Sequence, residues 1–173
     1  MAEDNFDEEM RQLQINYLEE TIVNLRNINS GLTACLEDLS AFNIDETYRS
    51  VHSLKGTAGT YGFMVFTDPV MHLEDVLSRV REKKMEMSAA VLRFIVSSFE
   101  ILIGGFAEAR ELFIAGNIII DKDSEFINSY FSLVVNCEQI VSACPVPERY
   151  LKARDGNAIN DAENERAENI PDK

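Results

Sequence analysis

The sequence predicts an all-α protein: an antiparallel up-and-down four-helix bundle with an additional C-terminal helix and a disordered tail. Apolar residues recur at helical spacing over most of the chain. Glycine and proline, which interrupt helices, account for 8 and 4 of the 173 residues. The connections between the expected helices are short, which favours antiparallel neighbours. We expect one bundle domain at residues 1–144 and a polar, disordered tail or linker at residues 145–173.

The first two helices are expected from the apolar stripe and from one capping signal. Apolar residues repeat every three or four positions from residue 6 to about 39, where Gly31 is a candidate interruption. The link "SAFNID" follows, and Asn43 or Asp45 can cap the next helix. This second helix carries the most unusual stretch of the chain.

The later helices have clear start signals. In "TDPV" either Thr67 or Asp68 can cap the third helix, and the proline suits its first turn. Ser88 can cap a fourth helix at residues 89–115, which is apolar on most sides and is therefore expected at the centre of the bundle. "SEFINSYFSLVVNCEQIVSAC" predicts one last helix, closed by "PVP".

Charge and cysteine usage limit the classes of partner and compartment. The formal net charge is −14, so we expect neither nucleic-acid binding nor attraction to anionic membranes, which both need clustered basic residues. The N-terminus is acidic and does not read as a signal peptide, and the apolar run at residues 94–107 is too short to span a bilayer. Cys35, Cys137 and Cys144 are not spaced as metal-ligand pairs. These features predict a cytoplasmic protein with reduced cysteines.

The stretch "SVHSLKGTAGTYGF" keeps three glycines inside or beside a helix, although each interior glycine costs about 1 kcal/mol relative to alanine. On a helical projection His52 lies roughly 130° from the centre of the apolar face, and Gly56 and Gly59 lie within about 40° of it. These glycines would clear the surface beside the histidine, so that a partner or a phosphoryl group can approach closely. Lys55, one turn along, can bring its ammonium to the same place. Gly62 is expected to be a C-cap.

The combination points to chemistry that none of these residues indicates alone. A lone histidine on a helix usually has no special task. An exposed imidazole, a lysine three residues later and a surface cleared by glycines together provide a nucleophile, a cation and room for a donor. This set suits phosphoryl transfer to imidazole.

The motif "HSLKGTAGTYGF" resembles the phosphorylation motif of histidine phosphotransfer (HPt) domains, most closely those at the N-terminus of CheA-type chemotaxis kinases. A second resemblance is the Leu-Glu pair that ends in Glu74. The resemblance implies phosphorylation of His52 on Nε2, without a nucleotide or metal site in the domain. Glu74 would accept a hydrogen bond from Nδ1–H and so fix the tautomer. Lys55 would stabilise the charge of the phosphoryl group, and Gly56 and Gly59 would form the partner-docking surface.

The resemblance also implies the partners. His52 would accept a phosphoryl group from a histidine kinase ATP-binding domain or a receiver aspartate, and pass it to the receiver domain of a response regulator. The Mg²⁺ ion for these steps would come with the partner. The chain would thus be a phosphocarrier rather than an enzyme, since it lacks the ATP-binding boxes of histidine kinases. Two alternatives remain: an N-terminal fragment of a CheA-like kinase, and a non-phosphorylated helical adaptor that docks a receiver.

One position departs from the family pattern. Many CheA relatives have a histidine three residues before the glutamate, where this chain has Met71, and a histidine follows one position later at His72. One residue along a helix is about 100° of rotation, so His72 falls about 100° off the face on which the family's histidine lies. We therefore expect His72 to be a surface or rim residue outside the site.

Overall fold

The computed structural model describes residues 2–116 and 125–147, with the side chains of residues 2–6 left out of the description. Every regular element in these two segments is a helix. The elements are α1 (Ala2–Ala34), η1 (Leu39–Ala41), α2 (Ile44–Thr60), η2 (Met64–Phe66), α3 (Thr67–Arg81), α4 (Ala89–Ile114), α5 (Glu125–Asn136) and α6 (Glu138–Ala143). The predicted all-α class is confirmed.

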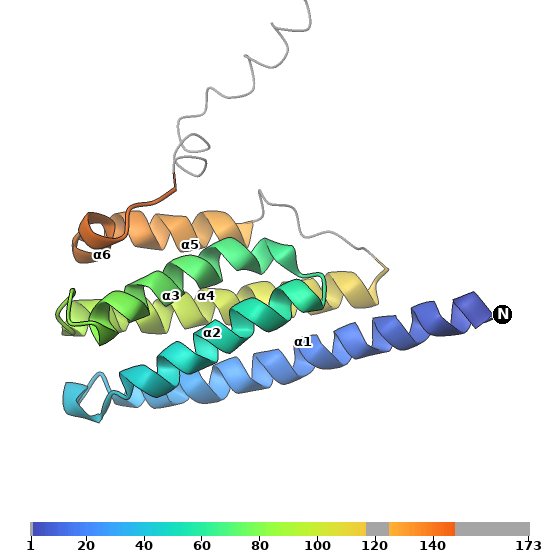
Figure 1. Ribbon diagram of the computed structural model, residues 1–173, viewed down its shortest axis with the longest axis horizontal. Coiled ribbons are helices and arrows are strands. Elements are labelled where there is room, and N and C mark those ends of the chain that lie inside the picture. The colour runs from blue at the N-terminus through green and yellow to red at the C-terminus, as the bar shows by residue number, and fades with distance from the viewer. Residues whose placement is uncertain (1, 117–124, 148–173) are drawn as a thin grey trace, which may run out of the picture.

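The helices run alternately up and down the long axis of the bundle (Figure 1). The closest pairs are α1 with α4 and α2 with α3, while α5 packs on α4 and also touches α3. The first turns of α1 extend beyond the other helices at the end marked N in Figure 1.

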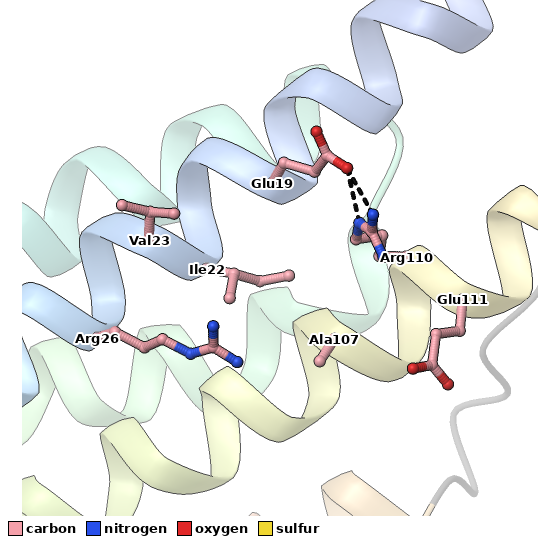
Figure 2. A pocket seen from close by; sticks show the side chains of 7 residues that line it. All are labelled: Glu19, Ile22, Val23, Arg26, Ala107, Arg110 and Glu111. Atoms are coloured by element: carbon pink, nitrogen blue, oxygen red, sulfur yellow. Dashed lines mark hydrogen bonds and ion pairs between the residues drawn. The ribbon is translucent and has the colours of Figure 1, made fainter.

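The α1–α4 seam combines apolar packing with one ion pair at its edge, as Figure 2 shows. Ile22 is buried on α1 and faces Ala107 of α4 across the seam. Beside them, two nitrogens of Arg110 donate to one oxygen of Glu19 at 2.9 and 2.6 Å. A shallow pocket of about 290 Å³ lies between these side chains. Two of its charged groups, Glu19 and Arg110, are paired across a packing contact, and its lining comes from α1 and α4 rather than from α2, which carries His52.

Helix α4 is the central helix of the core. By length and composition alone it could cross a membrane, but 56% of its most apolar window is buried against other helices, which is typical of a core helix. Phe106 of α4 stacks on Phe66 with ring centroids 3.8 Å apart, and Phe126 of α5 lies 4.9 Å from Phe66. Gly105 permits this arrangement, because a Cβ there would lie 2.6 Å from the Phe126 ring. Helix α5 is therefore seated on a glycine of α4.

Helix ends follow some of the predicted signals. Asn43 caps α2 by accepting from the Glu46 amide at 3.1 Å, and Ser88 caps α4 by accepting from the Val91 amide at 3.2 Å. Gly62 takes φ +87° just after α2, where the next amide bonds back to the Ala58 carbonyl at 2.8 Å. This is a Schellman ending, so the role predicted for Gly62 is confirmed.

The expected cap of α3 is wrong. Neither Thr67 nor Asp68 is the N-cap, which is Phe66, a residue without a side-chain cap bond. The turn η2 runs directly into α3, and the Thr67 amide bonds to the Met64 carbonyl. The backbone of this turn does what a capping side chain would otherwise do.

Two helix boundaries also differ from expectation. Helix α1 continues through Gly31 and ends at Ala34, earlier than residue 39. The expected last helix is two helices, because Cys137 adopts an extended conformation (φ −105°, ψ 96°) between α5 and α6. Most of the predicted tail, residues 148–173, lies outside the described residues.

Candidate functional site

His52 lies on the solvent side of α2, with 61% of its side chain exposed. The helical period explains this placement, because the apolar positions of α2 point into the core and His52 falls on another face. The buried positions are Thr47, Val51, Leu54 and Ala58. A ring placed in this way is open to a reacting partner.

Glu74 reaches His52 from the neighbouring helix α3. Its Oε1 lies 2.6 Å from Nδ1 of His52, and only 11% of the Glu74 side chain is exposed. An ionised carboxylate can only accept hydrogen bonds, so Nδ1 of a neutral imidazole carries the proton in this contact. The Nε2 nitrogen then has the free lone pair. The structure therefore brings together the histidine and the glutamate that were singled out from the sequence.

Lys55 completes this group. Its ammonium forms an ion pair with Oε2 of Glu74, the oxygen that His52 does not use. Burial of Glu74 on its own would raise the pKa of the carboxyl, but the hydrogen bonds and charges of Lys55 and His52 outweigh it and lower that pKa below its usual value. Glu74 is therefore ionised near neutral pH and can accept from both neighbours.

Two further side chains border the site, and the sequence reasoning missed both. The Tyr48 hydroxyl lies 3.5 Å from Oε1 of Glu74, and the Tyr48 ring stacks on the His52 ring at 6.0 Å. The guanidinium of Arg81 lies 4.7 Å from the centre of the Tyr48 ring. Helical spacing indicates them once the pairing of α2 with α3 is known, because Tyr48 lies one turn before His52 on α2 and Arg81 lies two turns after Glu74 on α3.

The surface beside His52 is partly bare. A Cβ at Gly56 would meet no atom within 4 Å, whereas one at Gly59 would lie 3.6 Å from the sulfur of Met64. Met64 is 64% exposed and Met71 of α3 is 47% exposed. Gly56 thus borders open space, while a flexible methionine side chain lies over Gly59.

The placement predicted for His72 is wrong: it is buried, with 8% exposed. Its Nδ1 lies 3.1 Å from the Tyr130 hydroxyl and its Nε2 lies 3.0 Å from the Cys144 carbonyl. The face of α3 that carries His72 is covered by α5 and α6, whereas the prediction considered only the α2 side. The expectation that His72 lies outside the site is confirmed, since its ring contacts Tyr130 and the Cys144 carbonyl rather than Glu74.

The buried surroundings of His72 and Cys144 indicate that both residues have a structural role. Burial lowers the pKa of the His72 imidazole, so its neutral form is favoured. Burial, together with a hydrogen bond to Asp75, raises the pKa of the Cys144 thiol to about 12. A thiol with such a pKa is unreactive near neutral pH. These groups join the C-terminal helices to α3.

The candidate metal-binding oxygens at His52 belong to Glu74, and they already accept from protein donors. No group of three or more His, Cys, Asp and Glu side chains in the described segments is placed to hold a metal ion. At the site itself, each oxygen of Glu74 already accepts from a neighbouring side chain. A Mg²⁺ ion would have to displace one of these donors to bind here.

Comparison of the sequence with known proteins identifies a family and relatives of this chain. A family model described as "Hpt domain" matches residues 9–110. This segment contains α2, α3 and the whole His52–Lys55–Glu74 group.

Two curated relatives are both named "Chemotaxis protein CheA". The protein from Borreliella burgdorferi is 25% identical over 154 residues, which cover 89% of this chain and 15% of the relative. The protein from Salmonella typhimurium is 26% identical over 66 residues, which cover 38% of this chain and 10% of the relative. The chain thus aligns with only a small part of each relative's length. No solved structure matches it significantly.

Proposed function

The chain belongs to the Hpt domain family, and on that premise we propose that His52 is the phosphoryl-accepting residue of a two-component phosphorelay. The supporting observation is the contact of 2.6 Å between Nδ1 of His52 and Oε1 of Glu74. It leaves Nε2 unprotonated in the neutral ring, on the side chain that is 61% exposed. A nucleophilic nitrogen and an accessible surface are the two requirements for attack on a phosphorus atom.

The reaction is a displacement at phosphorus. The lone pair of Nε2 forms a bond to the phosphorus atom, while the bond from phosphorus to the donor oxygen breaks and its electron pair leaves with that oxygen. Because Nδ1 keeps its proton, positive charge develops on the ring. The Glu74 carboxylate, 2.6 Å from Nδ1, lies where it stabilises this charge. In the second step a carboxylate oxygen of a receiver aspartate attacks the phosphorus atom, the bond from phosphorus to Nε2 breaks, and its electron pair returns to Nε2.

To assist this step, Lys55 has to exchange its ion pair with Glu74 for contacts with the phosphoryl group. In the resting structure its ammonium is bound to Glu74. An incoming phosphoryl group offers several anionic oxygens beside His52, and these compete for the ammonium. We assign Lys55 to the stabilisation of those oxygens during transfer, as positioning and electrostatics dominate the catalysis of phosphoryl transfer.

The partners follow from the chemistry. The donor is the ATP-binding domain of a histidine kinase or a phosphorylated receiver, and the acceptor is the receiver aspartate of a response regulator. The Mg²⁺ ion comes with these partners, since the oxygens of Glu74 are engaged by His52 and Lys55. Similarity to two CheA proteins favours a chemotaxis-type kinase and receiver. The chain is a phosphocarrier in this proposal, and we place it in the cytoplasm, where such partners act.

The test is labelling by a CheA-type kinase catalytic domain with radioactive ATP and Mg²⁺, followed by addition of a receiver. We expect an acid-labile label on the chain that the receiver removes. His52→Gln should abolish the label. The chain has only two histidines, so His72→Leu is the matched control and should retain it. A label that persists in His52→Gln would contradict the assignment, and no labelling by kinases or by phosphorylated receivers would favour a non-phosphorylated adaptor.

A further inference from the structure

Tyr48 contacts both members of the His52–Glu74 pair. Its hydroxyl lies 3.5 Å from Oε1 of Glu74, the same oxygen that lies 2.6 Å from Nδ1 of His52. Its ring stacks on the imidazole with a centroid distance of 6.0 Å and an interplanar angle of 18°. One side chain therefore borders the ring that reacts and the carboxylate that orients it.

The Tyr48 ring is itself held in place from the adjacent helix. The Arg81 guanidinium lies 4.7 Å from the centre of the Tyr48 ring, within the range of a cation–π contact. Arg81 also donates to Asp45 of α2 at 2.8 Å. These contacts join the start of α2 to the end of α3 and limit the positions that the phenol can take.

We propose that Tyr48 is a positioning residue that keeps Glu74 bonded to His52 while Lys55 moves to the phosphoryl group. This inference rests on the proposed function. In the resting state Glu74 accepts from Lys55 on Oε2, and from His52 and Tyr48 on Oε1. When Lys55 leaves, Oε2 loses its donor and the carboxylate becomes freer to rotate. The Tyr48 hydroxyl then supplies the remaining donor besides His52 itself.

The hydroxyl, rather than the ring, is the group that this argument requires. A phenylalanine at position 48 would keep the stacking on His52 and the contact with Arg81, but would remove the donor to Glu74. The 3.5 Å separation is long for a hydrogen bond. Its contribution should therefore be small in the resting protein and larger once Lys55 is absent.

The experiment uses Tyr48→Phe, Lys55→Ala and the double variant, with Tyr61→Phe as a matched control that removes a phenol hydroxyl near the other end of α2. The first measurement is the ratio of the two neutral tautomers of His52, from the ¹⁵N NMR shifts of its ring under alkaline conditions. The second is the rate of labelling by phosphoramidate, a small donor that needs no docking surface. Thermal unfolding checks that each variant is folded.

We expect Tyr48→Phe alone to change the labelling rate by about twofold, and by about tenfold in the Lys55→Ala background, as for the loss of one hydrogen bond of growing strength. Loss of the hydroxyl should also raise the population of the Nε2–H tautomer of His52, slightly in Tyr48→Phe alone and more in the Lys55→Ala background. Tyr61→Phe should change neither the labelling rate nor the tautomer ratio. Equal tautomer ratios and equal rates with and without the hydroxyl, in both backgrounds, would overturn the proposal.

The tautomer ratio is measured without any phosphoryl transfer, so the two proposals fail differently. If His52 is never phosphorylated by protein partners but Tyr48→Phe shifts the tautomer ratio, the phosphorelay assignment fails and the positioning contact stands. If wild-type labelling is normal and the Tyr48 variants behave as wild type, the positioning role alone fails.

Discussion

Nδ1 of His52 and Oε1 of Glu74 lie 2.6 Å apart across the seam between α2 and α3. The histidine is largely in solvent, while the glutamate is largely buried. The carboxylate is therefore a fixed acceptor and the ring is oriented by it. Because the carboxylate engages Nδ1, Nε2 is the ring nitrogen that is available for chemistry. The predictions below follow from this contact and from the packing around it.

Lys55→Ala should slow phosphoryl transfer by about 100- to 1,000-fold, as expected when one donor to a developing anion is removed. The free energy of unfolding should fall by no more than about 1 kcal/mol, because a third of the Lys55 side chain is exposed and solvent screens such pairs. Single-turnover kinetics and urea unfolding measure the two effects. Normal transfer by a clearly destabilised variant would contradict the assigned role.

Gly56→Leu should stabilise the protein and impair its function at the same time. A Cβ at this exposed helical position meets no atom within 4 Å, and leucine favours a helix by about 0.8 kcal/mol over glycine. The added side chain would stand beside His52, where a protein partner has to approach. We expect a higher melting temperature together with slower transfer to a receiver.

Phosphoramidate labelling is the control for Gly56→Leu, because this small donor does not need the cleared surface. Its rate should stay near that of wild type. Unchanged transfer to the receiver would show that the bare surface has no role in docking. Slower labelling by phosphoramidate together with slower transfer to the receiver would indicate damage to His52 itself.

Two adjacent glycines of α4 should respond in opposite directions to alanine. A Cβ at Gly105 would lie 2.6 Å from the Phe126 ring, so Gly105→Ala should destabilise the bundle by about 1–3 kcal/mol through overpacking. At Gly104 a Cβ meets no atom within 4 Å, so Gly104→Ala should stabilise by about 1 kcal/mol. Urea unfolding measures both. Equal effects of the two changes would refute the seating of α5 on Gly105.

The buried imidazole of His72 should make stability depend on pH. Because burial lowers its pKa from the usual 6.5, the unfolded chain binds a proton first as the pH falls below that value. The free energy of unfolding should then be greatest above pH 6.5 and decline below it. His72→Leu removes this component, and should cost about 1–3 kcal/mol at pH 7.5 because Tyr130 and the Cys144 carbonyl lose their partner.

Unfolding of wild type and His72→Leu at pH 7.5 and pH 5.5 tests this dependence. The difference between the two proteins should shrink at the lower pH. If the two proteins lose the same free energy of unfolding between these pH values, His72 does not titrate as its burial implies.

The sequence was sufficient for the helical class and for the faces of α2 on which the candidate site residues lie, because both depend on helical periodicity. The faces of His52, Lys55 and Gly56 follow from 100° per residue along one helix. The Schellman glycine at position 62 could likewise be predicted from its place at the helix end.

The parts that the sequence did not reveal depend on contacts between distant segments. His72 is buried because α5 and α6 cover α3, and no local pattern around residue 72 encodes that. Tyr48 and Arg81 meet across two helices, so their spacing within either helix was suggestive only after the α2–α3 pairing was known. The cap of α3 was missed because the turn η2 takes the place of a capping side chain.

The most direct test of the account is to determine which ring nitrogen carries the phosphoryl group. Phosphorylated, ¹⁵N-labelled protein can be examined by NMR, where coupling to phosphorus identifies the substituted nitrogen. Since Glu74 engages Nδ1, the account predicts a bond from phosphorus to Nε2 of His52. Phosphorylation on Nδ1, or on a residue other than His52, would contradict it.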